Sequence, residues 1–292
     1  MPSVAFLSMD NLDDFFVYDE LLIPYFEQAG WQVTSVPWRD STDWNNFDAV
    51  IVRSPWDYQQ SPASFLQCLR DIERSTAYLE NPLALMEWNL EKTYLKVLQE
   101  QEVATLPTLW QCGFDLNAIE QARSRFNTNK LIVKPVLSAN ADDTFLLTGE
   151  TAVMQQDTLS DLYQQRQIMI QPFAEAVVEA GEYSVFYCDN RYSHAILKTP
   201  KQGDFRVQEE HGGSLQAVTP DHDILAVCEQ ALAAMPTDSL YARVDIIRFD
   251  NHWAIMELEL IEPSLYFNLD DASSPRFVEA FLSRYNRRHA GG

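Results

Sequence analysis

The sequence predicts a mixed α/β fold, with α+β character in its second part, in which a small parallel α/β unit comes first. Strand-like and helix-like segments alternate over residues 1–81, which is typical of strand–helix–strand units with a parallel sheet. Further along, pairs of strand-like runs separated by two or three polar residues indicate antiparallel hairpins. The chain has 292 residues, 46% of them hydrophobic, which is enough for one large domain or two to three smaller ones.

The first 81 residues contain three predicted strands and a helix between the first two. Apolar residues recur at helical spacing in Asp19–Ala29, and Gly30 is expected to end that helix. The strands are predicted from short apolar or alternating runs at Val4–Ser8, Trp31–Val36 and Ala49–Arg53.

A polar group follows the third predicted strand. Arg53, Ser54 and Asp57 come where ligands of parallel α/β units gather, beyond the carboxyl ends of the strands. They are therefore candidate substrate-binding residues. The alternative is a polar loop that caps the helix after it.

Two lysines of the linking region between residues 82 and 134, Lys92 and Lys134, are candidate site residues. Asn81 and the proline after it mark a boundary, and Leu83–Gln101 is predicted as one helix that carries Lys92. Leu131–Val133 is an apolar strand that ends at Lys134. A lysine at the end of a buried strand needs either an anion or a path to solvent.

The remaining elements alternate between strands, hairpins and helices. The loop Leu137–Thr144 could offer backbone N–H groups to a phosphate, although it lacks the glycines that ease such an approach. Gly203–Gly213 is a polar loop with one arginine and a Gly-Gly pair. The other predicted elements are a strand at Ile168–Gln171, a hairpin formed by Tyr183–Tyr187 and Tyr192–Lys198, and helices at His222–Ala234 and Pro275–Arg288.

The hairpin at Tyr241–Phe267 concentrates acidic residues among apolar ones. Antiparallel pairing would bring Asp245 close to Glu257 and Glu259, with Arg243 two residues away on the same strand face. Carboxylates that converge among apolar neighbours repel one another, and a divalent cation removes that repulsion. Oxygen-only ligands point to Mg²⁺ or Mn²⁺ rather than zinc. The alternative is a strand with one solvated, acidic face.

Charge and composition exclude several classes of function. With 43 acidic residues against 21 Lys and Arg, the formal net charge is -22. Since no basic cluster is dense enough to follow phosphates, nucleic acid and anionic membranes are not expected partners. The five histidines have no zinc spacing, and no Walker-type loop or Gly-x-Ser-x-Gly motif occurs.

Cysteine usage and hydropathy predict a cytoplasmic protein. The four cysteines lie far apart without a Cys-x-x-Cys pair, so neither a zinc cluster nor a disulfide framework is expected. The N-terminal MPSVAFLSMD lacks a basic segment and is expected to form a strand rather than a signal peptide. No apolar run approaches about 18 residues, so we expect no transmembrane helix.

Taken in order, these motifs resemble those of the ATP-grasp superfamily: a lysine in a linking helix, strand-Lys-Pro, Gln-Pro-Phe, Gly-Glu, a lysine-bearing strand, and Arg-x-Asp followed by Glu-x-Glu. The pattern is closest to the glutathione-synthetase-like, ribosomal-protein glutamate ligase and D-cycloserine-forming ligase types. The resemblance implies a preATP-grasp α/β domain at 1–81 and a two-part ATP-grasp region at 82–292. In that region it implies a small lid subdomain at about 106–173, and a larger catalytic subdomain at 174–292 that includes the linking helix 82–101.

The resemblance also implies roles for individual residues. Those expected to hold ATP are Lys92, Lys134, Gln171, Pro172, Phe173, Glu182 and Lys198. Those expected to hold Mg²⁺ (or Mn²⁺) are Asp245, Glu257 and Glu259, with Glu262 as an alternative because the family usually has asparagine in the place of Glu259. The catalytic arginines would be Arg206 and Arg243, and substrate-loop residues would be His211, Gly212 and Gly213.

The activity that the resemblance implies is an ATP- and Mg²⁺-dependent carboxylate–amine ligase. A small amino-acid-like or peptide carboxylate would form an acyl phosphate, and a nucleophile would then attack it, with release of ADP and phosphate. The alternatives are a catalytically silent ATP-binding regulatory or scaffold protein of the same fold, and a phosphotransferase without ligation. The resemblance also allows a homodimer.

Overall fold

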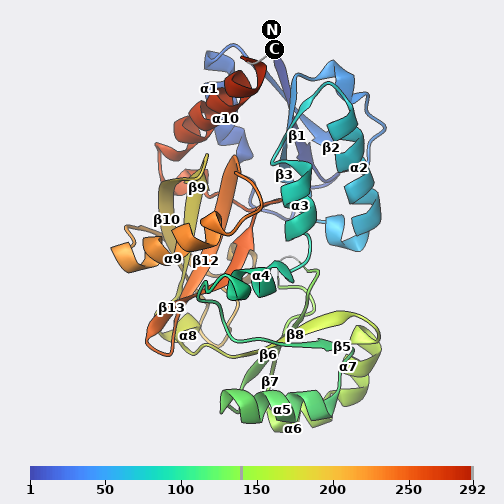
Figure 1. The fold of residues 1–292 in the computed structure, drawn as a ribbon, viewed down its shortest axis with the longest axis vertical. Helices are drawn as coiled ribbons and strands as arrows, with labels where there is room; N and C mark the ends of the chain where they lie inside the picture. Colours follow the sequence, from blue (N-terminus) through green and yellow to red (C-terminus); the bar gives the residue numbers. More distant parts are fainter. Residues whose placement is uncertain (139–140, 291–292) are drawn as a thin grey trace.

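Three sheets follow one another along the long axis of the molecule (Figure 1). The computed structural model describes residues 1–138 and 141–290. A parallel sheet lies at the end that carries both termini, a five-stranded antiparallel sheet lies in the middle, and a four-stranded antiparallel sheet lies at the far end. The mixed α/β class predicted from the sequence is confirmed. No helix in the described ranges is both long and apolar enough to cross a bilayer.

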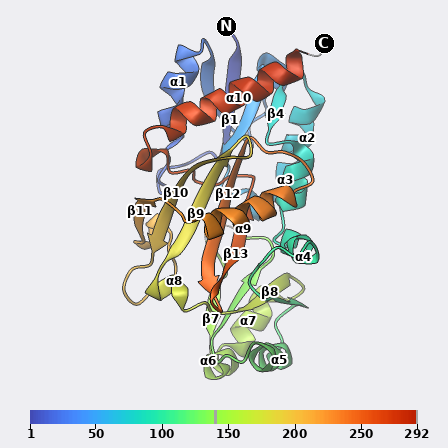
Figure 2. The ribbon, with the colours of Figure 1, turned by 60° about the vertical axis from the view of Figure 1, so that its left-hand side comes forward.

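The first sheet is parallel, with strand order β2-β1-β3-β4. Its strands are β1 (Ser3–Ser8), β2 (Gln32–Pro37), β3 (Ala49–Ser54) and β4 (Tyr78–Glu80). Alternate residues of β1 and β3 pack on α2 (Pro62–Arg74) on one face, and on α1 (Ile23–Gln28) and the C-terminal helix α10 (Ser273–His289) on the other. Both faces are therefore buried, as is usual for parallel sheets. Because α10 lies against this sheet, residues 1–81 do not complete its core alone (Figure 2).

The two predicted helices of the first hundred residues are each divided. Asp19–Ala29 forms a 3₁₀ turn, Asp19–Leu22, followed by α1, with Pro24 in the first turn of α1; the chain then turns at Gly30, whose φ is +81°. Two further 3₁₀ turns are Trp44–Asn46 and Tyr58–Gln60.

The single helix predicted over Leu83–Gln101 is wrong. The segment forms α3 (Leu83–Asn89) and α4 (Tyr94–Glu100), and Lys92 lies in the turn between them. The backbone N–H of Lys92 donates to the Val136 carbonyl at 2.8 Å, and its Nζ donates to the Ser138 carbonyl at 2.7 Å. These contacts with the segment that follows the strand carrying Lys134 hold the turn in place.

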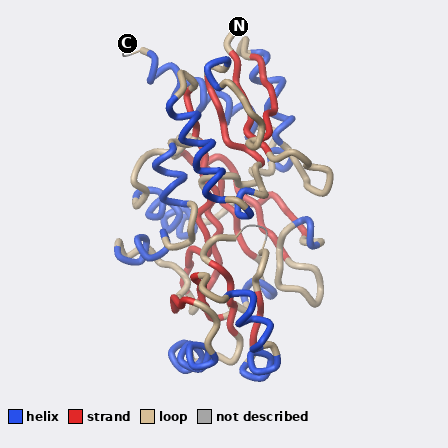
Figure 3. The backbone as a smooth tube through the Cα atoms, turned by 90° about the vertical axis from the view of Figure 1, so that its right-hand side faces the viewer, coloured by secondary structure: helices blue, strands red, loops and turns tan. Residues whose placement is uncertain are grey.

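The sheet at the far end has strand order β5-β8-β6-β7, with all pairs antiparallel. Its strands are β5 (Leu109–Cys112), β6 (Leu131–Pro135), β7 (Phe145–Leu147) and β8 (Gln167–Pro172). The helices α5 (Leu116–Phe126), α6 (Gly149–Met154) and α7 (Gln156–Tyr163) cover one face and form the end of the molecule farthest from the termini (Figure 3). The opposite face of this sheet is turned toward the central sheet.

The central sheet has order β11-β10-β9-β12-β13 and is antiparallel. Its strands are β9 (Glu182–Cys188), β10 (Arg191–Thr199), β11 (Ser214–Val218), β12 (Tyr241–Phe249) and β13 (His252–Glu259), and α8 (Ala176–Glu179) precedes them. Apolar residues such as Val185 and Val244 face α9 (His222–Ala233), which covers one side (Figure 2). Their neighbours Ser184 and Asp245 point the other way, so the polar face of the sheet is free to line a cavity.

Candidate active site

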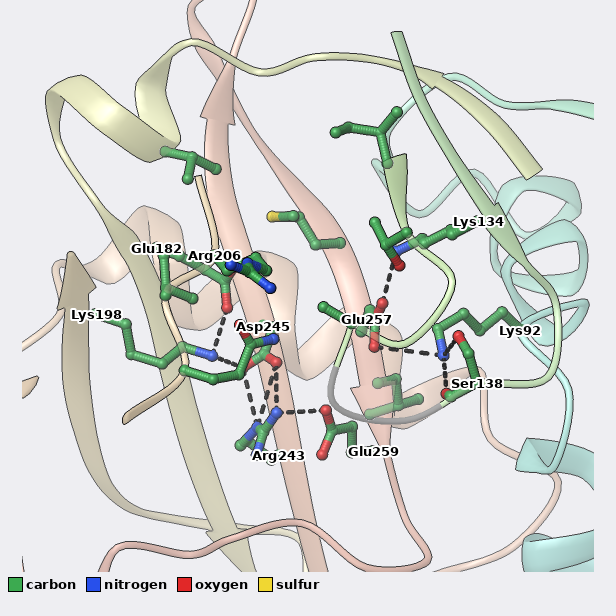
Figure 4. Close-up of a pocket in the computed structure, with 18 of the residues that line it drawn as sticks. Lys92, Lys134, Ser138, Glu182, Lys198, Arg206, Arg243, Asp245, Glu257 and Glu259 are labelled. Carbon is green, nitrogen blue, oxygen red and sulfur yellow. Dashed lines mark hydrogen bonds and ion pairs between the residues drawn. The ribbon is translucent and has the colours of Figure 1, made fainter. Parts of the chain in front are cut away.

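A deep cavity lies between the central sheet, the far sheet and the first sheet, with about 1590 Å³ of empty space counted to its open mouth. Its walls carry most of the charged residues that the sequence analysis singled out. These are Lys92, Lys134, Glu182, Lys198, Arg206, Arg243, Asp245, Glu257, Glu259 and Glu262. Figure 4 shows all but the last of them converging from the strands of both antiparallel sheets and from the turns beside them.

The β12–β13 hairpin places four of these residues in two facing pairs. Arg243 lies opposite Glu259, and Asp245 lies opposite Glu257. The turn is tight because Asp250 and Asn251 both adopt positive φ values, of 44° and 64°. A register shift between Asp245 and Ile246 lies between the turn and the site. Ile246 still pairs with Ile255, so Met256 is an extra residue on β13, and Glu257 rather than Met256 lies opposite Asp245.

Two lysines from outside the hairpin hold Glu257. Lys134, at the end of β6, donates to its Oε1 at 2.6 Å, and Lys92 lies 3.8 Å from its Oε2. Burial would raise the pKa of Glu257, but Lys134 and Lys92 outweigh it and hold the pKa at about 2. Glu257 is therefore an anion that keeps both lysines aimed into the cavity (Figure 4).

Asp245 is the centre of a second charged group. It forms ion pairs with Arg243 at 2.9 Å and with Lys198 at 3.3 Å, and Lys198 also contacts Glu182 at 2.5 Å. Burial works against its ionisation, but Arg243 and Lys198 lower the pKa of Asp245 to about 2. Burial raises the pKa of Glu182 in spite of its lysine partner.

The hairpin end nearest the first sheet has surplus negative charge. Burial, together with Asp245, Glu257 and Glu262, raises the pKa of Glu259 to about 8, although Arg243 pairs with it. Burial also raises the pKa of Glu262 to about 7. A wall with oxygen donors alone and more acidic groups than neighbouring cations suits a hard divalent cation such as Mg²⁺. Within residues 1–138 and 141–290, however, no three acidic, His or Cys side chains converge closely enough to form a preassembled metal cluster.

Arg206 lies on the loop between β10 and β11 and is held by its own neighbour. Its Nε and Nη2 bind the Asp204 carboxylate at 3.1 Å and 2.7 Å, and this arginine lowers the pKa of Asp204. The loop is tied to the first sheet's side of the cavity, because the Tyr18 hydroxyl donates to Glu209 at 3.0 Å. Arg206 therefore lines the cavity without being committed to another cavity residue.

The Gln-Pro-Phe segment at the end of β8 lines an apolar part of the cavity. Gln171 donates to the Thr108 hydroxyl at 3.0 Å, and the Phe173 N–H donates to the Lys130 carbonyl at 3.0 Å. Both contacts hold the segment through residues that do not line the cavity. The apolar residues around it are Leu106, Ile132, Pro172, Phe173, Ala174, Val177 and Met256.

Part of the predicted phosphate loop Leu137–Thr144 lies outside the described residues, at positions 139 and 140. Of the part that is described, Ser138, Ala141 and Thr144 line the cavity. The loop is anchored from below, because the Tyr163 hydroxyl donates to the Asp143 carbonyl at 2.7 Å.

None of Arg53, Ser54 and Asp57, the candidate substrate residues of the first domain, lines the cavity. Arg53 is 1% exposed and donates to Asp19 at 2.9 Å and to the Pro263 carbonyl at 3.2 Å. Asp57 accepts from the Trp38 indole at 2.7 Å and pairs with Arg39. These partners turn the polar side chains of the segment away from the cavity.

His211, Gly212 and Gly213 also lie outside the cavity wall. A Cβ on Gly213 would lie 2.1 Å from the Val207 carbonyl oxygen, and Gly212 has a φ of +82°. The glycine pair is therefore required by the close return of the loop on itself. In the same loop, Phe205, Val207, Gln208 and Glu210 line the cavity instead.

The sequence analysis missed several aromatic residues of the cavity, among them Phe15, Trp56, Tyr58 and Tyr266. Trp56 and Tyr58 flank Asp57, and they could have been found by asking which side chains alternate with the polar ones after β3. Nothing local identified Phe15 or Tyr266, which reach the cavity from segments about 250 residues apart in sequence.

Comparison with known proteins gives three consistent similarities. Residues 4–81 match the family described as the N-terminal domain of D-cycloserine synthetase DcsG. The chain is 30% identical over 260 residues to the cycloserine biosynthesis protein DcsG of Streptomyces lavendulae, covering 85% of this chain and 87% of that protein. The crystal structure of D-cycloserine synthetase DcsG superposes with a TM-score of 0.86 at 27% identity, over 97% and 99% of the two chains.

A more distant similarity extends the fold. The D-alanine–D-alanine ligase of Bacillus anthracis, in a crystal structure with ATP, superposes with a TM-score of 0.68 at 12% identity, over the full length of both chains. At this identity the similarity concerns the fold alone.

Proposed function

The chain belongs to the DcsG family of ADP-forming ATP-grasp ligases, and we propose that it activates a small amino-acid-like carboxylate as an acyl phosphate and joins it to a nitrogen nucleophile. The observation that carries this proposal is the cavity itself. It gathers three lysines and two arginines around a row of carboxylates, whereas a protein that only bound a nucleotide would not need both arginines. The silent-scaffold alternative therefore loses its support.

The phosphates of ATP would lie among Lys92, Lys134 and Lys198, which approach the cavity from three different segments. The adenine would lie against the apolar surface at Gln171 and Phe173. Asp245, Glu257 and Glu259 would hold Mg²⁺, which supplies charge neutralisation at the phosphates when bound. In the structure these carboxylates form ion pairs with lysines and an arginine. A bound triphosphate could replace the carboxylates as the partner of those cations.

In the proposed reaction, an oxygen of the substrate carboxylate attacks the γ-phosphorus and the bond to the bridging oxygen breaks, so that an acyl phosphate and ADP form. The protein's part is to position the reactants and balance charge, because phosphoryl transfer needs little covalent chemistry from side chains. Arg206, on a loop at the cavity mouth, would meet the transferred phosphoryl group. Arg243 would stabilise the oxyanion that forms when nitrogen attacks the acyl carbon and phosphate leaves.

The relatives suggest a specific product. Their names associate them with D-cycloserine, whose ring is closed by an amide-type bond between a carboxyl carbon and a nitrogen borne on the side-chain oxygen of a D-serine skeleton. We propose the same ring closure for this chain, with carboxylate and nucleophile in one molecule. Ring closure within a bound substrate requires no second substrate site.

The test is ADP release from ATP and Mg²⁺ with a pool of D-serine derivatives that carry nitrogen on the side-chain oxygen, followed by mass spectrometry of the product. Stoichiometric ADP and a cyclised or ligated product are expected. Release of AMP, or a stable phosphorylated product without ligation, would contradict the proposed chemistry. ADP release with a different carboxylate pool would support the ligase activity but show that the substrate is another carboxylate.

A further inference from the structure

The end of the cavity beside the first sheet has an aromatic wall. Phe15, Trp56 and Tyr58 all line it, and the rings of Phe15 and Trp56 pack with centroids 5.2 Å apart. Tyr58 is only 4% exposed, so its ring cannot turn out to solvent. Glu262 lines the same cavity, and the nearby Tyr58 hydroxyl partly offsets the rise that burial causes in the pKa of its carboxyl group.

The backbone at Glu262 is fixed by buried side chains from two directions. The Trp56 indole N–H donates to the Glu262 carbonyl at 2.9 Å, and Arg53 donates to the next carbonyl, that of Pro263, at 3.2 Å. The Tyr241 hydroxyl lies 2.8 Å from the preceding carbonyl, that of Ile261. Three consecutive carbonyls are thus bound, which holds the Glu262 side chain at a set place in the cavity.

The charge of Glu262 is not matched within the protein. The four other carboxylates deep in the cavity each have a lysine or arginine within 4 Å: Glu182, Asp245, Glu257 and Glu259. Across the described ranges, Glu262 has no ion pair of this kind. Its neighbours leave a place for a cation that the chain itself does not supply.

The wall around Glu262 selects the kind of cation. A metal ion would need several further oxygen ligands, whereas the aromatic faces of Phe15, Trp56 and Tyr58 offer none. An ammonium group is attracted both by a carboxylate and by aromatic faces, and it has three N–H donors to satisfy. Arg243 lines the same cavity as Glu262, so the carboxylate and the ammonium of one small molecule have oppositely charged partners in its wall.

We propose that Glu262, with the aromatic wall of Phe15, Trp56 and Tyr58, is the subsite that binds the primary ammonium group of the substrate. Arg53 and Trp56 position it through the backbone of Glu262 and Pro263. The subsite rests on the proposed ligase function, and it gives that function its selection for amino acids over plain carboxylic acids. It also assigns Glu262 a task distinct from metal binding.

The test compares D-cycloserine with isoxazolidin-3-one, the same ring without the amino group. Binding to the full chain is measured by titration calorimetry with ADP and Mg²⁺ present, at a pH that keeps the amino group protonated. The parent protein is expected to prefer D-cycloserine. Glu262→Gln, which keeps the shape, should weaken D-cycloserine binding about 10- to 100-fold and leave isoxazolidin-3-one binding unchanged. Glu229→Gln, on the exposed side of α9 and outside the cavity wall, removes the same charge and should keep the preference.

Each other outcome overturns the subsite. The subsite is overturned if the parent shows no preference or does not bind D-cycloserine. It is also overturned if Glu262→Gln weakens the binding of both ligands equally, or if Glu229→Gln weakens D-cycloserine binding as much as Glu262→Gln does. If Glu262→Gln instead weakens ADP binding in a Mg²⁺-dependent way, Glu262 is a metal ligand. ADP affinity and ADP release of the parent are measured separately, so the proposed ligase function is tested independently of the Glu262 subsite.

Discussion

Lys198 on β10 lies directly opposite Glu182 on β9, and their side chains form an ion pair of 2.5 Å that is almost completely buried. Asp245 contacts the same lysine from the neighbouring strand β12. Lys198, one of the proposed phosphate-binding cations, is therefore part of the hydrogen-bonded core of the central sheet and is placed by strand register rather than by a flexible loop.

Replacing Lys198 by methionine should destabilise the protein by about 3–5 kcal/mol, because Glu182 would keep a buried charge without a partner. The double variant Lys198→Met/Glu182→Gln should recover part of that loss. Urea unfolding of the two variants and the parent measures both effects. The exposed pair Lys130–Glu175 is the matched control, and Lys130→Met should cost less than about 1 kcal/mol. A double variant no more stable than Lys198→Met would contradict the buried pairing.

Glu257→Gln should lower the turnover rate about 100-fold or more while keeping the fold. The substitution preserves volume but removes the anion that Lys134 and Lys92 share, and with it a proposed Mg²⁺ ligand. Steady-state ADP release at varied Mg²⁺ concentration measures the effect, and thermal unfolding checks the fold. Glu229→Gln on the exposed side of α9 is the control and should retain parental turnover. Parental activity in Glu257→Gln would show that the metal assignment is wrong.

Local patterns predicted the β12–β13 hairpin of the candidate active site but not its exact register. The polar tip predicted the turn, and antiparallel pairing predicted that Asp245 lies close to Glu257 and Glu259. The register shift that places Glu257 opposite Asp245 was not predicted, because alternation counted from the turn puts Met256 there. The end of β6 placed Lys134 from its own short run. Such features depend on residues that are close in sequence, or on the alternation of side chains along a strand.

Long-range packing decided the features that the sequence analysis missed. Arg53 is held by Pro263, 210 residues away, so its burial as a structural cation had no local signal. The break at Lys92 depends on the Val136 carbonyl, and α10 covers a sheet formed at the opposite end of the chain. Helical spacing alone favours an unbroken helix because it is insensitive to such partners.

Asn81→Asp should destabilise the protein by about 2–6 kcal/mol. The buried Asn81 amide donates to the Tyr241 and Leu260 carbonyls at 2.9 Å and 2.8 Å, and its oxygen accepts from the Leu240 N–H at 2.6 Å. Aspartate keeps the acceptor but leaves two buried carbonyls without a donor. Chemical unfolding measures the loss, and the exposed Asn46→Asp should change stability by less than about 0.5 kcal/mol. Equal effects of the two substitutions would contradict the bridging role of Asn81.

His194 should make the protein less stable as the pH falls from 6.5 to about 4. The ring stacks on Phe186 and binds the Leu265 carbonyl at 2.9 Å, and burial lowers its pKa from 6.5 to about 4. Between these values the unfolded chain binds a proton that the folded protein does not, so stability rises with pH and is lost on acidification. The loss from this one group is about 3 kcal/mol.

The pH effect is measured as the difference in unfolding free energy between pH 6.5 and about pH 4 for the parent and for His194→Gln. Carboxyl groups that titrate in the same range contribute equally to both proteins and cancel in the comparison. The variant should have the shallower slope, even if it is less stable at pH 6.5, because glutamine cannot take up the proton. His252→Gln, at the exposed start of β13, should keep the parental slope. Parallel slopes for the parent and His194→Gln would mean that the buried imidazole is already protonated in the folded protein, and the Leu265 contact would then be a charged hydrogen bond.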